Sequence, residues 1–192
     1  FFAYFKFLQC FHGVISLSHT LHGMMVLDGH THLFDLGRGY IEKDWGTSFP
    51  KQYVWLQCNH FKEDINLFGS IAHIPFLGAS FLGFIAVFSY EGTQHRFATY
   101  NDAKYAFEKP SDRTFKIIFR RKSFKLEIIA ALENGTVLKA PRQGNMNDEI
   151  TETLDGSLEI SFWQNSTCLI STTGNSAAIE IVNFPQLVTA LK

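Results

Sequence analysis

Two acidic residues with a single residue between them give the chain its strongest chemical signal. Glu42 and Asp44 lie in a stretch that also holds two of the three Trp. Side chains two positions apart on a β-strand point to the same face, so both carboxyls would reach the same space. Close like charges favour keeping one of them protonated, and either could then donate a proton while its neighbour accepts one. The pair therefore predicts acid–base catalysis.

Aromatic and hydrogen-bonding side chains surround the two acids. A tight Gly-Thr-Ser-Phe-Pro connection predicts that the strand of the acids forms a hairpin with a second arm that begins near Tyr53. A solvated face rarely carries Tyr and Trp, whereas a ligand-lining face often does. Arg38 could instead pair with Glu42 or Asp44 and hold the hairpin as a buried network. The candidate substrate-binding residues are Arg38, Tyr40, Lys43, Trp45, Tyr53, Trp55, Gln57, Asn59, His60 and His73.

No metal site and no cofactor is predicted. His30 and His32 could point two imidazoles to one side of a strand, but no acid at suitable spacing completes a ligand set. Cys10, Cys58 and Cys168 are odd in number and widely spaced, which indicates neither a disulfide framework nor a Cys-x-x-Cys metal site. The cysteines therefore favour a reducing compartment, and we expect a cytoplasmic protein.

The composition excludes several classes of protein. The chain of 192 residues is 46% hydrophobic with a formal net charge of −1, so it should bury a core and offers no basic field for nucleic acid. Its 20 Phe exceed ordinary usage and imply a large apolar interior or an apolar ligand cavity. Lys6, Gln9 and His12 interrupt the opening apolar run before it reaches the length of a membrane span.

The elements that must position these residues are predicted to be strands throughout. Short β-rich runs recur at near-regular spacing, which is typical of an antiparallel barrel or sandwich. Asp28-Gly29 predicts a hairpin turn, and 155–156 and 173–174 predict further turns. Only 101–108 and the tail after Pro185 could be helical. The predicted strands are 14–26, 31–40, 53–61, 66–74, 82–90, 95–100, 114–119, 125–132, 136–140, 158–163, 167–172 and 178–182.

Four blocks of sequence resemble the tocopherol cyclase family and its bacterial relatives. The longest begins Gly-Arg-Gly-Tyr-Ile-Glu-Lys-Asp-Trp-Gly at 37–46 and ends Trp-Leu-Gln-Cys-Asn-His-Phe at 55–61. The second, Ile-Ala-His-Ile-Pro-Phe-Leu-Gly, lies at 71–78 and continues to position 84, and the third, Arg-Phe-Ala-Thr-Tyr, at 96–100. The fourth consists of Tyr4, Cys10, His12, Gly13 and Ser16. The resemblance covers roughly the first 100 residues and corresponds to the C-terminal half of the family.

The resemblance implies the second of two lipocalin-like β domains. The expected division is a segment at 1–13 that leads in from an upstream domain, a lipocalin-like domain at 14–184 and a tail at 185–192. The implied partners are that upstream domain of the same protein and an apolar isoprenoid ligand. Peripheral contact with a membrane would fit such a ligand, and in a plant the compartment would be the plastid.

The implied activity is that of an intramolecular lyase or isomerase. Such an enzyme protonates an isoprenoid alkene, such as that of a prenylated quinol, and traps the tertiary carbocation with a phenolic oxygen or with water. Glu42 and Asp44 would be its acid and base, and Arg38 or Lys43 would hold the quinol oxygens. The alternative is a non-catalytic lipocalin-like carrier of a lipid or isoprenoid, in which the charged hairpin only joins two domains.

Overall fold

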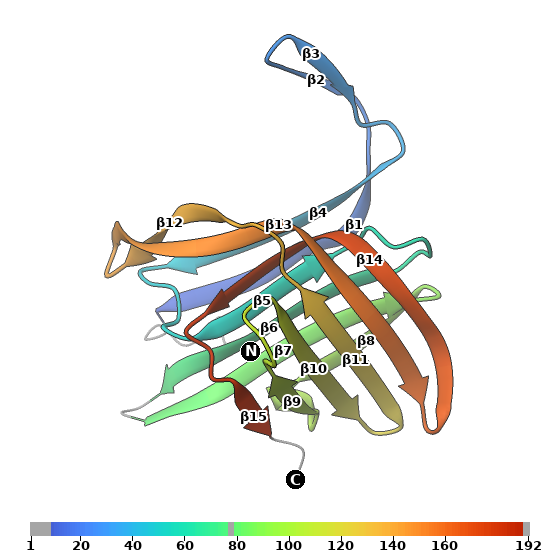
Figure 1. Cartoon of the computed structure of the whole chain (residues 1–192), viewed down its shortest axis with the longest axis vertical. Helices are drawn as coiled ribbons and strands as arrows, with labels where there is room; N and C mark the ends of the chain where they lie inside the picture. Colours follow the sequence, from blue (N-terminus) through green and yellow to red (C-terminus); the bar gives the residue numbers. More distant parts are fainter. Residues whose placement is uncertain (1–8, 77–78, 190–192) are drawn as a thin grey trace.

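The structure of the chain is a computed structural model that describes residues 9–76 and 79–189. About three quarters of these residues lie in antiparallel strands (Figure 1). The strands are β1 Cys10–Leu21, β2 Met24–Leu27, β3 His30–Leu33, β4 Gly37–Gly46, β5 Tyr53–Cys58, β6 Asn66–Phe76, β7 Ala79–Tyr90, β8 Thr93–Ala98, β9 Lys104–Glu108, β10 Thr114–Arg121, β11 Phe124–Ala131, β12 Thr136–Arg142, β13 Asn145–Gln164, β14 Thr167–Val182 and β15 Leu187–Thr189. The all-β prediction is confirmed.

One large curled sheet forms the body of the molecule. Its strands pair in the order β15-β9-β10-β11-β13-β14-β5-β6-β7-β8, and β12 pairs with β13 outside this path. Within the described residues the path of paired strands does not return on itself, so the barrel is open. The order brings β14, near the end of the chain, beside β5, which lies in its first third.

The phenylalanines fill the interior of this curled sheet. Phe107, Phe115, Phe119 and Phe162 are each 1% exposed or less, and they pack in one cluster with aliphatic side chains from β5, β10, β11 and β14. Burying a ring of this size stabilises the fold by about 1.5–3 kcal/mol. Of the two uses predicted for the 20 Phe, the buried interior therefore accounts for many of them.

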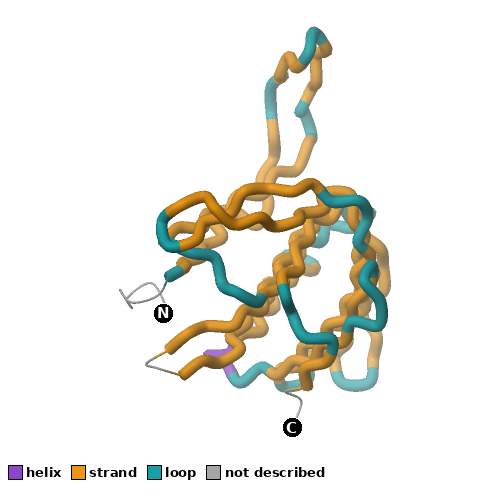
Figure 2. Tube along the Cα trace, turned by 60° about the vertical axis from the view of Figure 1, so that its left-hand side comes forward, coloured by secondary structure: helices purple, strands orange, loops and turns teal. Residues whose placement is uncertain are grey.

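A separate two-stranded ribbon, β1 paired with β4, lies across the outer face of the sheet (Figures 1 and 2). His12 on β1 stacks on Phe68 of β6 with ring centroids 4.8 Å apart, and Phe68 is fully buried although it does not belong to the interior cluster. The ribbon therefore creates a second buried layer, outside the curled sheet.

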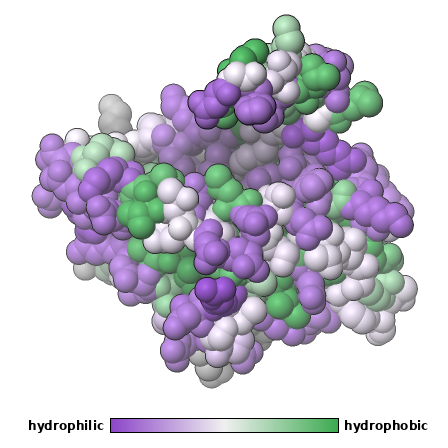
Figure 3. Space-filling view, turned by 45° about the horizontal axis from the view of Figure 1, so that its top comes forward, coloured by the Kyte–Doolittle hydropathy of each residue, from purple (hydrophilic) through white to green (hydrophobic). Residues whose placement is uncertain are grey.

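The ribbon continues into an arm that projects from the body, made of β2 and β3 (Figure 1). The predicted turn at Asp28-Gly29 is confirmed, and both residues have the positive φ that a type I′ turn requires. The predicted strands 14–26 and 31–40 are each broken, near Gly23 and Leu36, which also have positive φ. Figure 3 shows apolar side chains gathered on this arm, at the top of the view. Among the described residues, no helix is long and apolar enough to cross a membrane.

Both helical predictions are wrong. A short 3-10 helix, η2 Thr99–Asn101, ends at Asp102, which adopts a left-handed conformation with φ 61°. Residues 104–108 form β9 instead, because pairing with β10 buries Tyr105 and Phe107 in the interior. The tail contributes β15, which pairs with β9. Tertiary pairing therefore outweighs the local helical preference at both places.

The predicted hairpin between the strand of the acids and the strand of Tyr53 does not form. β4 pairs with β1, whereas β5 pairs with β14 and β6. The connection between them bonds to distant backbone: Thr47 N donates to Gln9 O at 2.8 Å and Phe49 N to Pro141 O at 3.2 Å. These bonds separate β4 and β5 into different layers that face each other.

The predicted turns at 155–156 and 173–174 are also absent, because both lie inside long strands. β13 and β14 run through them with register shifts around Gly156, which mark bulges. A bulge bends a strand and lets it continue onto a second part of the sheet. The extended part of β13 places Glu152 opposite Glu180 of β14, at the edge of the space beneath the ribbon.

Candidate functional site

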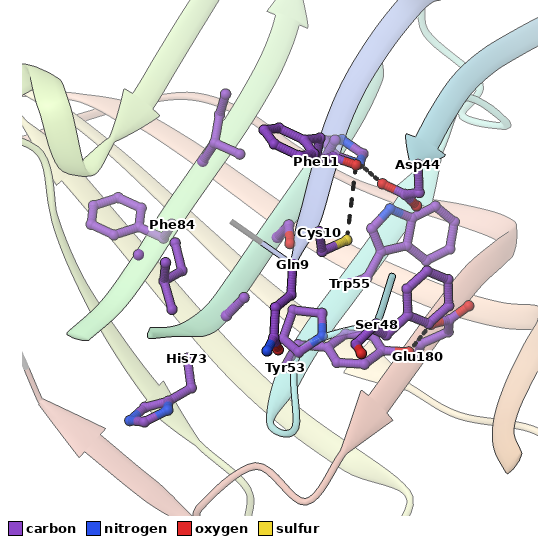
Figure 4. Close-up of a pocket in the computed structure, with 18 of the residues that line it drawn as sticks. Gln9, Cys10, Phe11, Asp44, Ser48, Tyr53, Trp55, His73, Phe84 and Glu180 are labelled. Atoms are coloured by element: carbon purple, nitrogen blue, oxygen red, sulfur yellow. Dashed lines mark hydrogen bonds and ion pairs between the residues drawn. The ribbon is translucent and has the colours of Figure 1, made fainter. Parts of the chain in front are cut away.

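A cavity of about 400 Å³ lies between the ribbon and the outer face of the sheet (Figure 4). Its floor is a row of residues in register across four strands: Glu180 of β14 lies opposite Trp55 of β5, which lies opposite Ser70 of β6, and Ser70 lies opposite Ile85 of β7. Strand alternation explains this floor, because the neighbouring Val54, Leu56 and Cys58 point into the interior and are at most 1% exposed.

Glu42, His12 and Asp44 form a cluster of titratable side chains on the ribbon side. His12 and Asp44 face each other in the register of β1 and β4, and Nδ1 of His12 lies 2.7 Å from Oδ1 of Asp44. The other ring nitrogen, Nε2, is buried, has no hydrogen-bond partner among the residues that the structure describes, and lies 3.8 Å from Oε2 of Glu42. Asp44 therefore orients the imidazole toward Glu42.

The electrostatics of this cluster favour a charged imidazole. Burial alone would lower the pKa of His12, but the hydrogen bond to Asp44 and the charges of Glu42 and Asp44 outweigh it and raise the pKa. One possible ligand atom from each of the three side chains lies within 4.8 Å of the other two, which is also close enough to hold a cation. Because Nδ1 of His12 is engaged with Asp44, we interpret the cluster as a proton-transfer group.

Glu42 receives two hydrogen bonds on one oxygen. Tyr40 Oη and, at 3.2 Å, Trp55 Nε1 both donate to Oε2, and the Glu42 side chain is 18% exposed. Burial raises the pKa of Glu42, and the hydrogen bonds from Tyr40 and Trp55, together with nearby His12, partly offset that rise. The donors come from both layers, so this carboxyl lies where ribbon and sheet meet.

A second carboxyl, on the sheet side, was missed by the sequence reasoning. Glu180 lines the cavity and accepts a hydrogen bond of 2.5 Å from Tyr53 Oη. Burial, followed by the charges of Glu152, Asp44 and Glu42, raises the pKa of Glu180 to about 7, although the Tyr53 bond opposes the rise. The one signal available was an acid inside a predicted strand, 178–182, that is otherwise almost wholly apolar.

Acidic residues dominate the charge of the cavity. Its described lining includes the four acids Glu42, Asp44, Glu152 and Glu180 but no Lys or Arg. Burial also raises the pKa of the Cys10 thiol, which lies in the same lining, to about 12. The site therefore suits a neutral ligand or a transient cation and disfavours an anion.

The structure brings about half of the predicted residues together. Glu42, Asp44, Trp45, Tyr53, Trp55 and His73 line the cavity, and Tyr40 acts on it through Glu42. Trp45 alternates with Asp44 along β4, yet it lines the cavity as well and stacks on Phe11 with centroids 5.5 Å apart.

The remaining predicted residues lie outside the lining of the cavity. Arg38 does not pair with either catalytic candidate, because it sits at the far end of β4, where its Nη1 lies 3.4 Å from Asp64 Oδ1. Lys43 points its amine to the Trp45 ring, 5.7 Å from the centroid. Gln57, Asn59 and His60 lie at or beyond the far end of β5, away from the cavity. Their predicted roles in binding stay predictions.

Comparison with a solved structure supports the fold. The crystal structure of kievitone hydratase from Nectria haematococca matches with a TM-score of 0.51 at 13% sequence identity, over 91% of this chain and 53% of that one. The likeness confirms the predicted lipocalin-like architecture.

Comparison with other sequences identifies the family. A chloroplastic protein of Oryza sativa subsp. japonica, described as a probable tocopherol cyclase, is 25% identical over 179 residues, which are 85% of this chain and 37% of the rice protein. The chloroplastic tocopherol cyclase of Zea mays is 25% identical over 180 residues, with the same coverage. The chain thus spans little more than a third of the length of these curated relatives. A family model described as tocopherol cyclase-like matches residues 3–182, and the chain belongs to this family.

Proposed function

We propose that this cavity carries out acid-catalysed addition of an oxygen nucleophile to an isoprenoid alkene, as a cyclase or hydratase. One observation carries the proposal: half-buried carboxyls with raised pKa values share an aromatic-walled cavity with the His12–Asp44 pair. Alkene protonation needs an acid that remains protonated near neutral pH, and desolvation supplies such an acid.

The reaction has two proton transfers. A carboxylic acid gives its proton to the less substituted alkene carbon, whose π electrons form the new C–H bond and leave a tertiary carbocation. A phenolic oxygen of the same substrate, or a water molecule, then forms the C–O bond and releases its proton to a carboxylate. Ring faces next to the cation, such as those of Trp45 and Trp55, would stabilise it by about 0.5–2 kcal/mol each.

Glu42, with His12 and Asp44, is suited to accept the proton of the nucleophile. His12 Nε2 lies 3.8 Å from Glu42, and Asp44 is bonded to the other ring nitrogen and is 31% exposed. A proton taken up by Glu42 could leave through the imidazole toward solvent. Asp44 would then act mainly by holding the imidazole and stabilising its charged form.

The substrate class that fits the cavity is a neutral prenylated quinol or another uncharged isoprenoid. The described lining has no Lys or Arg to bind a diphosphate or carboxylate, and its apolar walls suit a hydrocarbon chain. The carrier alternative is not favoured, because binding alone gives no role to a half-buried Glu180 that no basic side chain of the described residues pairs with.

The test uses the full-length protein, incubated with a prenylated hydroquinone in D2O. We expect a chromanol or a tertiary alcohol that carries one deuterium on carbon. Glu42→Gln should lower turnover by about 100-fold or more while ligand binding persists, and the exposed Glu159→Gln serves as control. Bound substrate that the wild-type protein never converts would contradict the proposal and favour the carrier.

A further inference from the structure

We propose that Glu180, on the sheet side of the cavity, is the catalytic residue that protonates the alkene, with Glu152 as a residue that keeps it protonated and Tyr53 as a residue that positions it. This assignment rests on the proposed function and deepens it, because it separates the acid from the base. It also differs from the prediction made from the sequence, in which Glu42 and Asp44 share both roles.

Geometry gives Glu180 a free oxygen that can carry the proton. Tyr53 Oη donates to Oε2 of Glu180, and Figure 4 shows the two residues linked on the cavity wall. Among the described residues no hydrogen bond reaches Oε1 of Glu180. The carboxyl is fixed from one side and lies next to Trp55 in the register of β14 and β5, so a proton on Oε1 would lie beside a ring that can stabilise the resulting cation.

Burial and the like charges that face Glu180 favour its neutral form, against the opposing hydrogen bond from Tyr53. Glu152 lies directly opposite on β13, Glu42 and Asp44 lie on β4, and Tyr53 is the hydrogen-bond donor from β5. Cys10 and His12 line the same cavity from β1. No salt bridge of the described residues includes Glu152 or Glu180, so the like charges are not balanced by a bonded cation.

Glu42 has three polar neighbours that stabilise its carboxylate and oppose the rise in pKa that burial causes. Glu42 accepts hydrogen bonds from Tyr40 and Trp55 and lies beside His12, and all three interactions stabilise a carboxylate. Glu42 has three partners that stabilise its carboxylate, whereas Glu180 has one, the hydroxyl of Tyr53. The carboxyl with more such partners is better suited to be the base, and the other to be the acid.

The proton balance of one turnover closes without a further reactant. The O–H bond of Glu180 breaks as the C–H bond forms, and the O–H bond of the nucleophile breaks as Glu42 takes its proton. Glu42 then releases this proton to water through His12, and Glu180 takes one up from water. Solvent thus restores both groups.

The experiment compares pH profiles of kcat/KM for the full-length wild-type protein and single-site variants. Activity that needs protonated Glu180 should be present below pH about 7 and be lost as the pH rises through that value. This loss of activity is the alkaline limb of the pH profile. Glu152→Gln removes a like charge and should move the alkaline limb to lower pH. Tyr53→Phe removes a bond that stabilises the carboxylate and should move it to higher pH. Shifts in opposite directions would not arise from a general loss of structure.

Glu180→Gln provides the direct test. Turnover should fall by about 100-fold or more while affinity for the prenylated hydroquinone is kept, and infrared spectra near neutral pH should lose a protonated-carboxyl band that Glu159→Gln keeps. Turnover of this variant near the wild-type level, or a limb that does not move in the other two variants, would overturn the assignment while leaving the proposed function intact. Absence of conversion by the wild-type protein would overturn both.

Discussion

The protonation of Glu180 predicts how the stability of the fold depends on pH. The pKa of this carboxyl is raised from an ordinary 4.5 to about 7, so the folded chain holds the proton over a range in which the unfolded chain has released it. Stability therefore falls as the pH rises from about 4.5 to about 7, since the folded state binds more protons there. Glu180→Gln cannot ionise and should lack this fall.

The size of this loss of stability follows from the difference between the pKa values of Glu180 in the unfolded and folded states. A difference of about 2.5 pH units corresponds to at most about 3 kcal/mol of unfolding free energy. Below pH about 4 the carboxyl is protonated in both states, so the variant and the wild type should differ only by the exchange of the side chain. Above pH about 8 the variant should gain up to that amount relative to the wild type.

Urea unfolding of the full-length protein at a series of pH values would measure this difference. Glu159→Gln is the matched control, since its carboxyl is exposed on β13 and its stability difference should stay flat over the same range. A Glu180→Gln curve parallel to the wild type at every pH would refute the reasoning, because it would mean that Glu180 ionises in the folded protein as it does in the unfolded chain.

Two further predictions concern the layers on either side of the cavity. Phe115→Ala should lower the unfolding free energy by about 3–5 kcal/mol, because Phe115 is fully buried in the interior. The control Ile129→Ala changes a side chain that is 42% exposed and should lower it far less. Equal losses of unfolding free energy in urea would contradict the assignment of Phe115 to the interior. His12→Phe should keep the aromatic contact with Phe68 and thus the folded ribbon, yet lower turnover by about 10-fold or more, because it removes both ring nitrogens, one of which contacts Asp44 while the other lies near Glu42. Unchanged kcat in this variant would exclude a role for the imidazole in proton transfer.

Local pattern predicts the strands well where one face is buried. Alternation in Tyr53–Cys58 correctly separates the interior residues Val54 and Leu56 from the cavity residues Tyr53 and Trp55. The Asp28-Gly29 turn is likewise a local property of two residues that tolerate positive φ. Both predictions needed only the period of the strand and the chemistry of the turn.

The local sequence pattern does not predict secondary structure or strand pairing where contacts with a distant part of the chain determine them. Residues 104–108 look helical alone, yet they form β9 because β10 offers a strand edge and an apolar interior. The hairpin predicted between the strands of Glu42 and Tyr53 fails for a related reason. The backbone of the connection bonds to Gln9 and Pro141, which places the two strands in separate layers.

The sequence by itself determined the all-β class, the pairing of Glu42 with Asp44 on one strand, and, by resemblance, the family. Only the tertiary structure decided that these acids face a cavity outside the curled sheet, and that Glu180 lies on its opposite wall. The physical reason is that a carboxyl's protonation depends on burial and on the groups around it. For Glu180 these groups come from β4, β5 and β13, which lie far apart in the chain and meet only in the folded sheet.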